Sequence, residues 1–177
     1  MISGPLQTIL HRTYSRSDFA YRVSLIRELL EYTFYTKHDS SVRSDTIDSF
    51  FTQSKRSTAD SSFIRALPSS FFEIFEPENF YKTLDTLTNE SKQMQSFPLT
   101  VPVAFTQADV DVIGAWVRQA IAPDALIDID IDPHVGAGCR FVWDNQRHDY
   151  SFNHYFDEKR TLLAQKLFRS RADVIPA

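Results

Sequence analysis

Two of the chain's four glycines fall in one short segment near its C-terminal end, and that segment constrains the fold more than any other. Asp132 and Pro133 close a run in which isoleucine alternates with aspartate, and Gly136 and Gly138 follow shortly after. Proline has no amide hydrogen, whereas glycine permits positive φ and close backbone approach. The segment therefore predicts a strand that ends at Pro133 and a tight loop before the next strand.

The elements before this loop predict a strand followed by a helix. Apolar residues alternate over 99–105, where Pro102 indicates an edge strand or a bulge. Thr106 is expected to cap the following helix, and Asp109 stands where a weaker capping box would place it. The next strand, 126–132, has isoleucine on one face and aspartate on the other.

The elements after the loop predict a hairpin and a closing helix. Residues 141–143 continue as a strand, 144–145 form a turn, and 148–152 begin the return strand. An amphipathic helix is expected over 153–168. Residues 98–177 thus predict a small domain with the order β-α-β-β-β-α.

Residues 1–97 are predicted to form an N-terminal helical bundle, because they show no strand-like alternation. The best-defined helix covers 18–35, and Ser17 or Asp18 can cap it. Five more apolar segments are separated by prolines and by Ser/Thr-rich turns. The residues of the best helix that recur at helical spacing and are expected in the core are Phe19, Val23 and Ile26. The fold class is α+β, mostly α.

A second apolar group could belong either to the core of the bundle or to an exposed surface. Phe71, Phe72 and Phe75 fit the core of the bundle, and an exposed patch that takes a partner helix is the alternative.

Charge, cysteine content and apolar runs exclude several classes of protein. The formal net charge of −4 argues against a nucleic-acid-binding protein, because such domains are usually basic. Cys139 is the single cysteine, so no intrachain disulfide can form, and we expect a buried, inert thiol inside an apolar strand. No apolar run approaches the ~18 residues that span a bilayer, and residues 1–16 lack a signal-peptide pattern. Membrane association is therefore expected only through a partner.

Two catalytic or nucleotide-binding interpretations are weak. The segment 136–138 lacks the Lys-Ser/Thr pair of a P-loop, and a strand follows it instead of a helix. The carboxylates of 124–132 with Glu158 could act as an acid/base pair, but no nucleophile accompanies them. We assign no catalytic residue and no cofactor.

A metal site is also unsupported by spacing. His134, His148 and His154 could join the aspartates of 126–132, yet none has a tight ligand spacing on a helix. A solvated acidic strand face is the simpler interpretation, and the alternative is that this face meets a basic partner. We assign no metal ligand.

The layout of residues 98–167 resembles the delta subunit of F-type ATP synthases, the bacterial counterpart of the mitochondrial oligomycin-sensitivity-conferring protein. The matching pieces are Ala104-Phe105-Thr106 before a helix, Asp132-Pro133 after a strand, Ala137-Gly138, and Asp149-Tyr150-Ser151 before the last helix. Ala137 and Tyr150 stand where the family has glycine. The residues that carry the motif have structural roles: Asp132, Pro133, Gly136, Gly138, Asp149 and Ser151.

The resemblance implies a non-catalytic subunit of the peripheral stalk, or stator. Its N-terminal bundle would hold N-terminal helices of the alpha subunits, and its C-terminal region the C-terminal ends of the b subunits. The head would then not rotate with the rotor during proton-driven ATP synthesis. The chain would be a monomer within a hetero-oligomer, peripheral to the cytoplasmic face of the cell membrane, and would bind no nucleotide, metal or nucleic acid. The residues expected near the stalk are Leu167, Phe168 and Arg169.

A second interpretation stays open: an uncharacterised soluble α+β protein-binding or regulatory module, or a small enzyme. A stator subunit should be a stable monomer that binds long helices. An enzyme should show a pocket in which polar groups converge.

Overall fold

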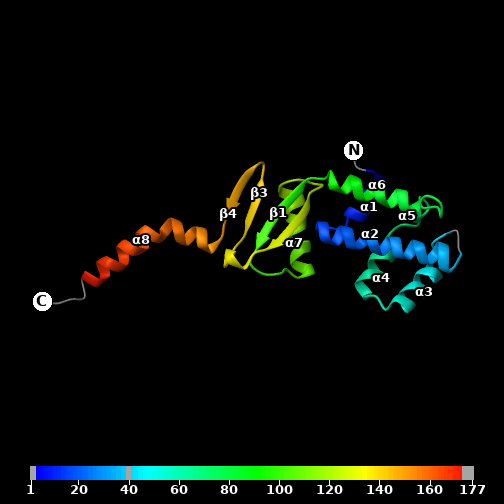
Figure 1. Cartoon of the computed structure of the whole chain (residues 1–177), viewed down its shortest axis with the longest axis horizontal. Helices are drawn as coiled ribbons and strands as arrows, with labels where there is room; N and C mark the ends of the chain where they lie inside the picture. Colours follow the sequence, from blue (N-terminus) through cyan, green and yellow to red (C-terminus); the bar gives the residue numbers. More distant parts are fainter. Residues whose placement is uncertain (1–2, 39–40, 173–177) are drawn as a thin grey trace. The chain divides into compact units, whose positions relative to one another are not determined.

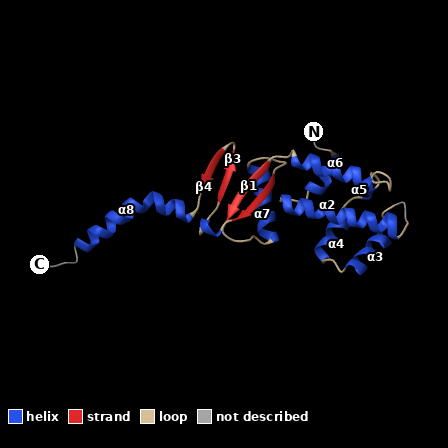
Figure 2. Ribbon diagram, viewed as in Figure 1, coloured by secondary structure: helices blue, strands red, loops and turns tan. Residues whose placement is uncertain are grey.

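The computed structural model describes residues 3–38 and 41–172, without the side chains of residues 161, 163 and 166–172. The protein is α+β and mostly α, and a small four-stranded mixed sheet follows a series of helices along the chain (Figures 1 and 2). This confirms the predicted fold class and the predicted order of elements.

The helices before the sheet correspond to the predicted apolar segments. They are α1 (Gly4–Leu10), α2 (Arg16–Glu31), the π-helical segment η1 (Tyr32–Thr36), α3 (Ser44–Ser54), α4 (Thr58–Arg65), α5 (Ser69–Phe72) and α6 (Phe80–Lys92). The predicted cap of α2 was wrong. The Ser15 hydroxyl accepts the Asp18 amide at 3.1 Å, so the cap lies two residues before Ser17 and three before Asp18.

The interior of these helices is one hydrophobic cluster built mainly from leucine, isoleucine and phenylalanine. Phe19, Val23 and Ile26 are 3%, 5% and 0% exposed, which confirms their predicted place in the core. Phe71, Phe72 and Phe75 are also buried in the cluster, so the core interpretation of that stretch was right.

The second half of the chain contains the strands and two longer helices. They are β1 (Ser96–Val101), α7 (Gln107–Ala120), β2 (Leu126–Ile131), the 3-10 turn η2 (Pro133–Val135), β3 (Arg140–Trp143), β4 (Gln146–Asp149) and α8 (Phe152–Ala172). The strand order is β2-β1-β3-β4. β1 pairs antiparallel with β3, and β3 pairs with β4 through the predicted turn at Asp144-Asn145, where both residues have positive φ.

Three predictions about strands need correction. β1 ends at Val101 and does not reach residue 105, because Pro102 has no N–H to continue the ladder and Val103 is 63% exposed. β1 also lies inside the sheet between β2 and β3, so the edge placement was wrong. Cys139 precedes β3 instead of lying within it and is partly buried, and this burial raises the pKa of its thiol.

The chain divides into two compact units. The helical unit comprises residues 1–95 and 111–126, and the sheet unit comprises residues 96–110 and 127–177. The sequence-based division into 1–97 and 98–177 stays a prediction. No sequence pattern pointed to the membership of 111–126 in the helical unit.

Residues 111–126 are held within the helical unit by a close contact between Gly114 and Tyr14 and by hydrogen bonds from Arg118. Gly114 faces the ring of Tyr14 so closely that a Cβ would overlap it. The Arg118 guanidinium lies 4.7 Å from the centre of the same ring and donates to the carbonyl oxygens of Leu10 at 2.6 Å and Thr13 at 2.5 Å. Burial is the main cause that lowers the pKa of Arg118.

Candidate functional site

The turn after β2 is organised by one carboxylate. Asp132 accepts the His134 amide at 2.9 Å, which caps η2, and its second oxygen lies 2.8 Å from the Arg140 guanidinium. The backbone hydrogen bond from His134 is the largest cause that lowers the pKa of Asp132. Pro133 takes the first position of η2, where a missing amide hydrogen costs nothing. Both residues stabilise the turn, as expected.

The two glycines adopt backbone conformations that other residues rarely take. Gly136 has φ 74° and Gly138 has φ 82°. A Cβ on Gly138 would overlap the carbonyl oxygen of Tyr150, so the loop can pass close to this backbone only because Gly138 has no side chain. The Tyr150 amide donates to the Cys139 carbonyl at 2.9 Å, and the Phe152 amide to the Ala137 carbonyl at 2.9 Å.

The third piece of the motif begins helix α8. Asp149 accepts the Ser151 amide at 3.0 Å, and the Ser151 hydroxyl accepts the His154 amide at 3.2 Å as the N-cap. Hydrogen bonding to Ser151 is the main cause that lowers the pKa of Asp149. The side-chain amide of Asn153 reaches back to the His134 carbonyl at 2.5 Å.

The structure therefore brings the motif residues together at the start of α8. The loop after β2, the end of β4 and the first turn of α8 are joined by backbone and carboxylate hydrogen bonds. Sequence reasoning missed Asn153 and Arg140 as members of this arrangement. Neither has a distinctive spacing, and the role of each depends on loop geometry that forms only in the fold.

α8, together with Tyr150 just before it, carries large apolar side chains that are about half exposed, and the Tyr150 ring stacks on Phe141 at 5.8 Å. We call Tyr150, Phe152, Tyr155, Phe156 and Leu162 the α8 apolar surface. Each of them exposes between 49% and 66% of its area, and the rings of Phe152 and Phe156 lie 5.2 Å apart. A hollow of about 550 Å³ lies beside the first turn. Leu167, Phe168 and Arg169 belong to α8, but their side chains are outside the described part, so their predicted stalk contact stays a prediction.

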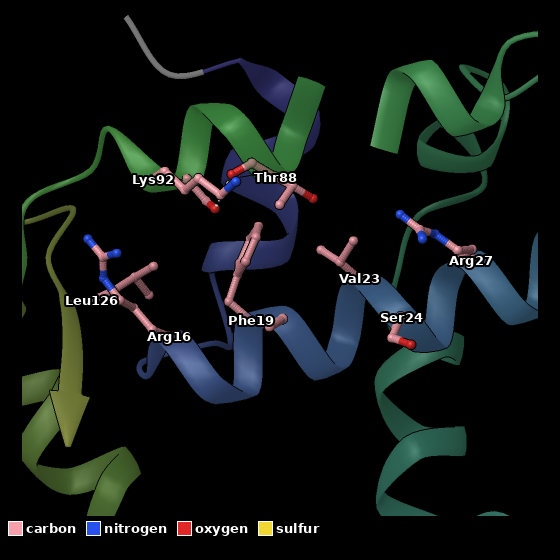
Figure 3. Close-up of a pocket in the computed structure, with 10 residues that line it drawn as sticks. Arg16, Phe19, Val23, Ser24, Arg27, Thr88, Lys92 and Leu126 are labelled. Carbon is pink, nitrogen blue, oxygen red and sulfur yellow. Dashed lines mark hydrogen bonds between the residues drawn. The ribbon is translucent and has the colours of Figure 1, made fainter. Parts of the chain in front are cut away.

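A second candidate surface lies in the helical unit, where α2 packs against α6 (Figure 3). We call it the α2–α6 groove, and its volume is about 320 Å³. Its apolar lining comes from Phe19, Ala20, Val23 and Leu126, and its polar lining from Arg16, Ser24, Arg27, Thr88, Ser91 and Lys92. Three of these ten side chains are cations and none is an acid. Sequence reasoning missed this groove, because its two walls are far apart along the chain.

The three histidines once considered as metal ligands lie in different environments. His134 pairs with Asp132 at 2.9 Å, His148 stacks on Phe141 at 4.9 Å, and His154 lies 3.5 Å from Glu158 on α8. Over the described ranges, His, Cys, Asp and Glu side chains form no group of three or more that could hold a metal ion.

The fold and these surfaces define an α+β protein in which the motif residues have structural roles, with a half-exposed apolar surface on α8 and a groove lined by three cations. No family model matches the chain, and no curated protein matches it. In the part of the chain that the structure describes, no helix has both the length and the apolar character needed to cross a membrane.

Proposed function

We propose that this chain is the delta-type stator subunit of an F-type ATP synthase, which links the catalytic alpha/beta head to the b subunits of the peripheral stalk. The observation that carries the proposal is the meeting of the motif at the start of α8. The loop with Gly138 passes against the Tyr150 backbone, and Ser151 caps the helix. The spacing of these sequence pieces suggested the family. Because the pieces meet at the start of α8, one structural role, fixing the start of that helix, accounts for all of them.

The order of the two regions supports the same proposal. Six α-helices precede β1 within residues 3–38 and 41–95, followed by a strand-helix-strand-strand-strand-helix region. The family resemblance implies a helical bundle before a small α/β region. The helical elements have a continuous core, so the bundle is a stable platform and not a set of loosely joined segments.

A stator must hold two partners, and the chain presents two surfaces that suit helices. In the proposal, an N-terminal helix from the head docks on the helical unit beside the α2–α6 groove. Arg16, Arg27 and Lys92 line the groove and could select that helix by charge, whereas Phe19, Val23 and Leu126 are already buried within the unit. The α8 apolar surface receives the C-terminal helices of the b subunits, since exposed aromatic side chains are frequent anchors of interfaces.

The role is mechanical, and in this proposal the chain is not an enzyme. Resistance to torque would come from apolar area buried at each end, and the anchored start of α8 would transmit force from stalk to sheet. The chain would reach the cytoplasmic face of the cell membrane through its partners.

Affinity capture tests the proposal. The tagged full-length protein, expressed at native level, is captured from mildly solubilised membranes, and co-purifying chains are identified by mass spectrometry. The proposal expects alpha, beta and b subunits in one assembly, with an unrelated tagged protein as control. Recovery of a folded chain without these subunits contradicts it. Recovery of another assembly would instead favour a protein-binding or regulatory module.

A further inference from the structure

Strand β2 forms one edge of the sheet, and its outer side has no neighbouring strand among the described residues. It is the first strand in the order β2-β1-β3-β4, so it pairs with β1 alone. It has six residues, whereas β4 at the opposite edge has four. An edge strand presents N–H and C=O groups with which another extended segment can pair.

The hydrogen bonds at the two ends of β2 establish which of its backbone groups face outward. The Leu126 amide donates to the Gln95 carbonyl at 3.1 Å, and the Asp132 amide donates to the Val101 carbonyl at 2.9 Å. The two bonds have the same offset in residue number, so β2 runs parallel to β1 without a bulge between them. Backbone groups alternate in direction along a strand, so the even-numbered residues of β2 face β1. Ile129 and Ile131 therefore direct their N–H and C=O groups away from the sheet.

Only the second half of this edge is open to a partner. Ile127 also faces outward, but it is 1% exposed and therefore covered. Ile131 is 51% exposed, and Asp128 and Asp130 are exposed as well. The open edge is thus 128–131, where Ile129 and Ile131 offer two donors and two acceptors.

The side chains of the open edge define what kind of strand would fit. Asp128 and Asp130 lie on one face of the sheet, and Ile129 and Ile131 lie on the other. In the described ranges, neither Asp128 nor Asp130 has an ion pair or a side-chain hydrogen bond, whereas Asp132 is paired with Arg140 at 2.8 Å. An added strand would place every second side chain beside the aspartates and the others beside the isoleucines.

We propose that the open edge of β2, residues 128–131, binds an extended segment of another protein in which lysine or arginine alternates with an apolar residue. The backbone of the segment pairs with Ile129 and Ile131, its cations face Asp128 and Asp130, and its apolar side chains cover the exposed part of Ile131. In strand addition of this kind, main-chain hydrogen bonds give affinity and alternate side chains give specificity. The β2 edge of a second copy is a poor occupant, because aspartates would then lie opposite aspartates.

The test is an NMR titration of the ¹⁵N-labelled full-length protein with a capped peptide in which four lysines alternate with three valines. We expect the largest amide shifts at residues 128–132. Two further peptides carry backbone N-methyl groups, one on every valine and the other on every lysine. Because alternate amides face opposite edges of an extended peptide, one methylated peptide should lose binding and the other should keep it.

Two protein variants of equal net charge separate a local effect from general attraction between the acidic chain and a basic peptide. Asp128→Asn with Asp130→Asn should weaken peptide binding at least about fivefold, because both cross-strand charge pairs are lost. Asp144→Asn with Asp157→Asn changes two exposed aspartates outside β2 and should bind like wild type. Circular dichroism establishes that each variant remains folded.

The proposal is overturned if the peptide shifts no amide at 128–132, if the two methylated peptides bind equally, or if both double variants bind alike. Shifts of the same amides with rising protein concentration in the absence of peptide would overturn it too, because a second copy would then occupy the edge. The proposal goes beyond the stator function and does not rest on it. The titration contains no ATP synthase subunit, so its outcome is independent of affinity capture.

Discussion

Helices α2 and α8 have similar apolar side chains but opposite environments. α2 buries Phe19, Val23, Leu25, Ile26, Leu29 and Leu30 against the other helices of its unit. On α8, every side chain described from residue 152 to 160 is exposed, although Phe152, Tyr155 and Phe156 are among them. The difference shows that α2 finds its partner within the chain. A helix with an uncovered aromatic surface is typical of an interface whose partner is another chain.

The largest expected effect compares one substitution in both helices. Leu29→Ala in α2 removes a fully buried side chain and should lower the free energy of unfolding by about 2–5 kcal/mol. Leu162→Ala in α8 removes a side chain that is 53% exposed and should change it by less than about 0.5 kcal/mol. Urea denaturation of the isolated protein measures both. Equal losses would mean that α8 is covered within the chain.

The next effect concerns the anchored start of α8. Gly138→Ala introduces a Cβ against the Tyr150 carbonyl at φ 82°, and we expect a loss of about 2 kcal/mol or more in the free energy of unfolding. Gly4→Ala is the matched control, because open space surrounds that position within 4 Å. Thermal unfolding of the two variants should therefore differ clearly. A neutral Gly138→Ala would show that the loop does not need its close approach.

A third substitution separates stability from partner binding on α8. Phe156→Asp should leave the free energy of unfolding within about 0.5 kcal/mol of wild type, since the side chain is half exposed. Capture of b subunits should fall at least about tenfold, as expected for loss of an aromatic anchor. Asp157→Ala, also exposed, is the control and should retain capture. We expect Phe168→Asp to behave like Phe156→Asp, and unchanged capture would place Phe168 outside the contact.

The smallest expected effect is a dependence of the free energy of unfolding on acidic pH. Hydrogen bonds lower the pKa values of Asp132 and Asp149 in the folded protein, so each ionised carboxylate stabilises the fold above its unfolded pKa of about 3.9. That contribution is lost as the pH falls through the lowered folded values, and it is constant near neutral pH. Unfolding measured between about pH 5 and pH 2 should show a shallower slope in Asp132→Asn than in wild type. Identical slopes would exclude the capped turn as a source of acid sensitivity.

The local sequence pattern predicted the helices, strands and turns well. It predicted poorly which of these elements pair or pack with one another. Apolar spacing located the helices, and Asp144-Asn145 marked a hairpin turn with positive φ at both positions. The Thr106 cap was also right, since the Thr106 hydroxyl accepts the Asp109 amide at 3.3 Å and the Asp109 carboxylate accepts the Thr106 amide at 3.0 Å. These features depend on residues close together in sequence, where propensity and capping decide the outcome.

The errors and omissions depend on contacts between distant segments. Pro102 suggested an edge strand, but sheet order is set by pairing of β1 with β3, which local sequence does not encode. The α2–α6 groove joins residues near position 20 to residues near position 90, and its charge appears only when both walls are in place. The sequence identified the motif residues that meet at the start of α8. It did not identify Asn153 and Arg140, which take part in the same arrangement.

The most direct test of the central claim is zero-length carboxylate–lysine cross-linking within the captured assembly. Lys92 lines the α2–α6 groove and Lys159 is exposed on α8, so the two lysines report on the two proposed interfaces. A stator subunit predicts links from Lys92 to an N-terminal segment of an alpha subunit and from Lys159 to the C-terminal end of a b subunit. Links from both lysines to the same partner, or to chains outside an ATP synthase, would contradict the account.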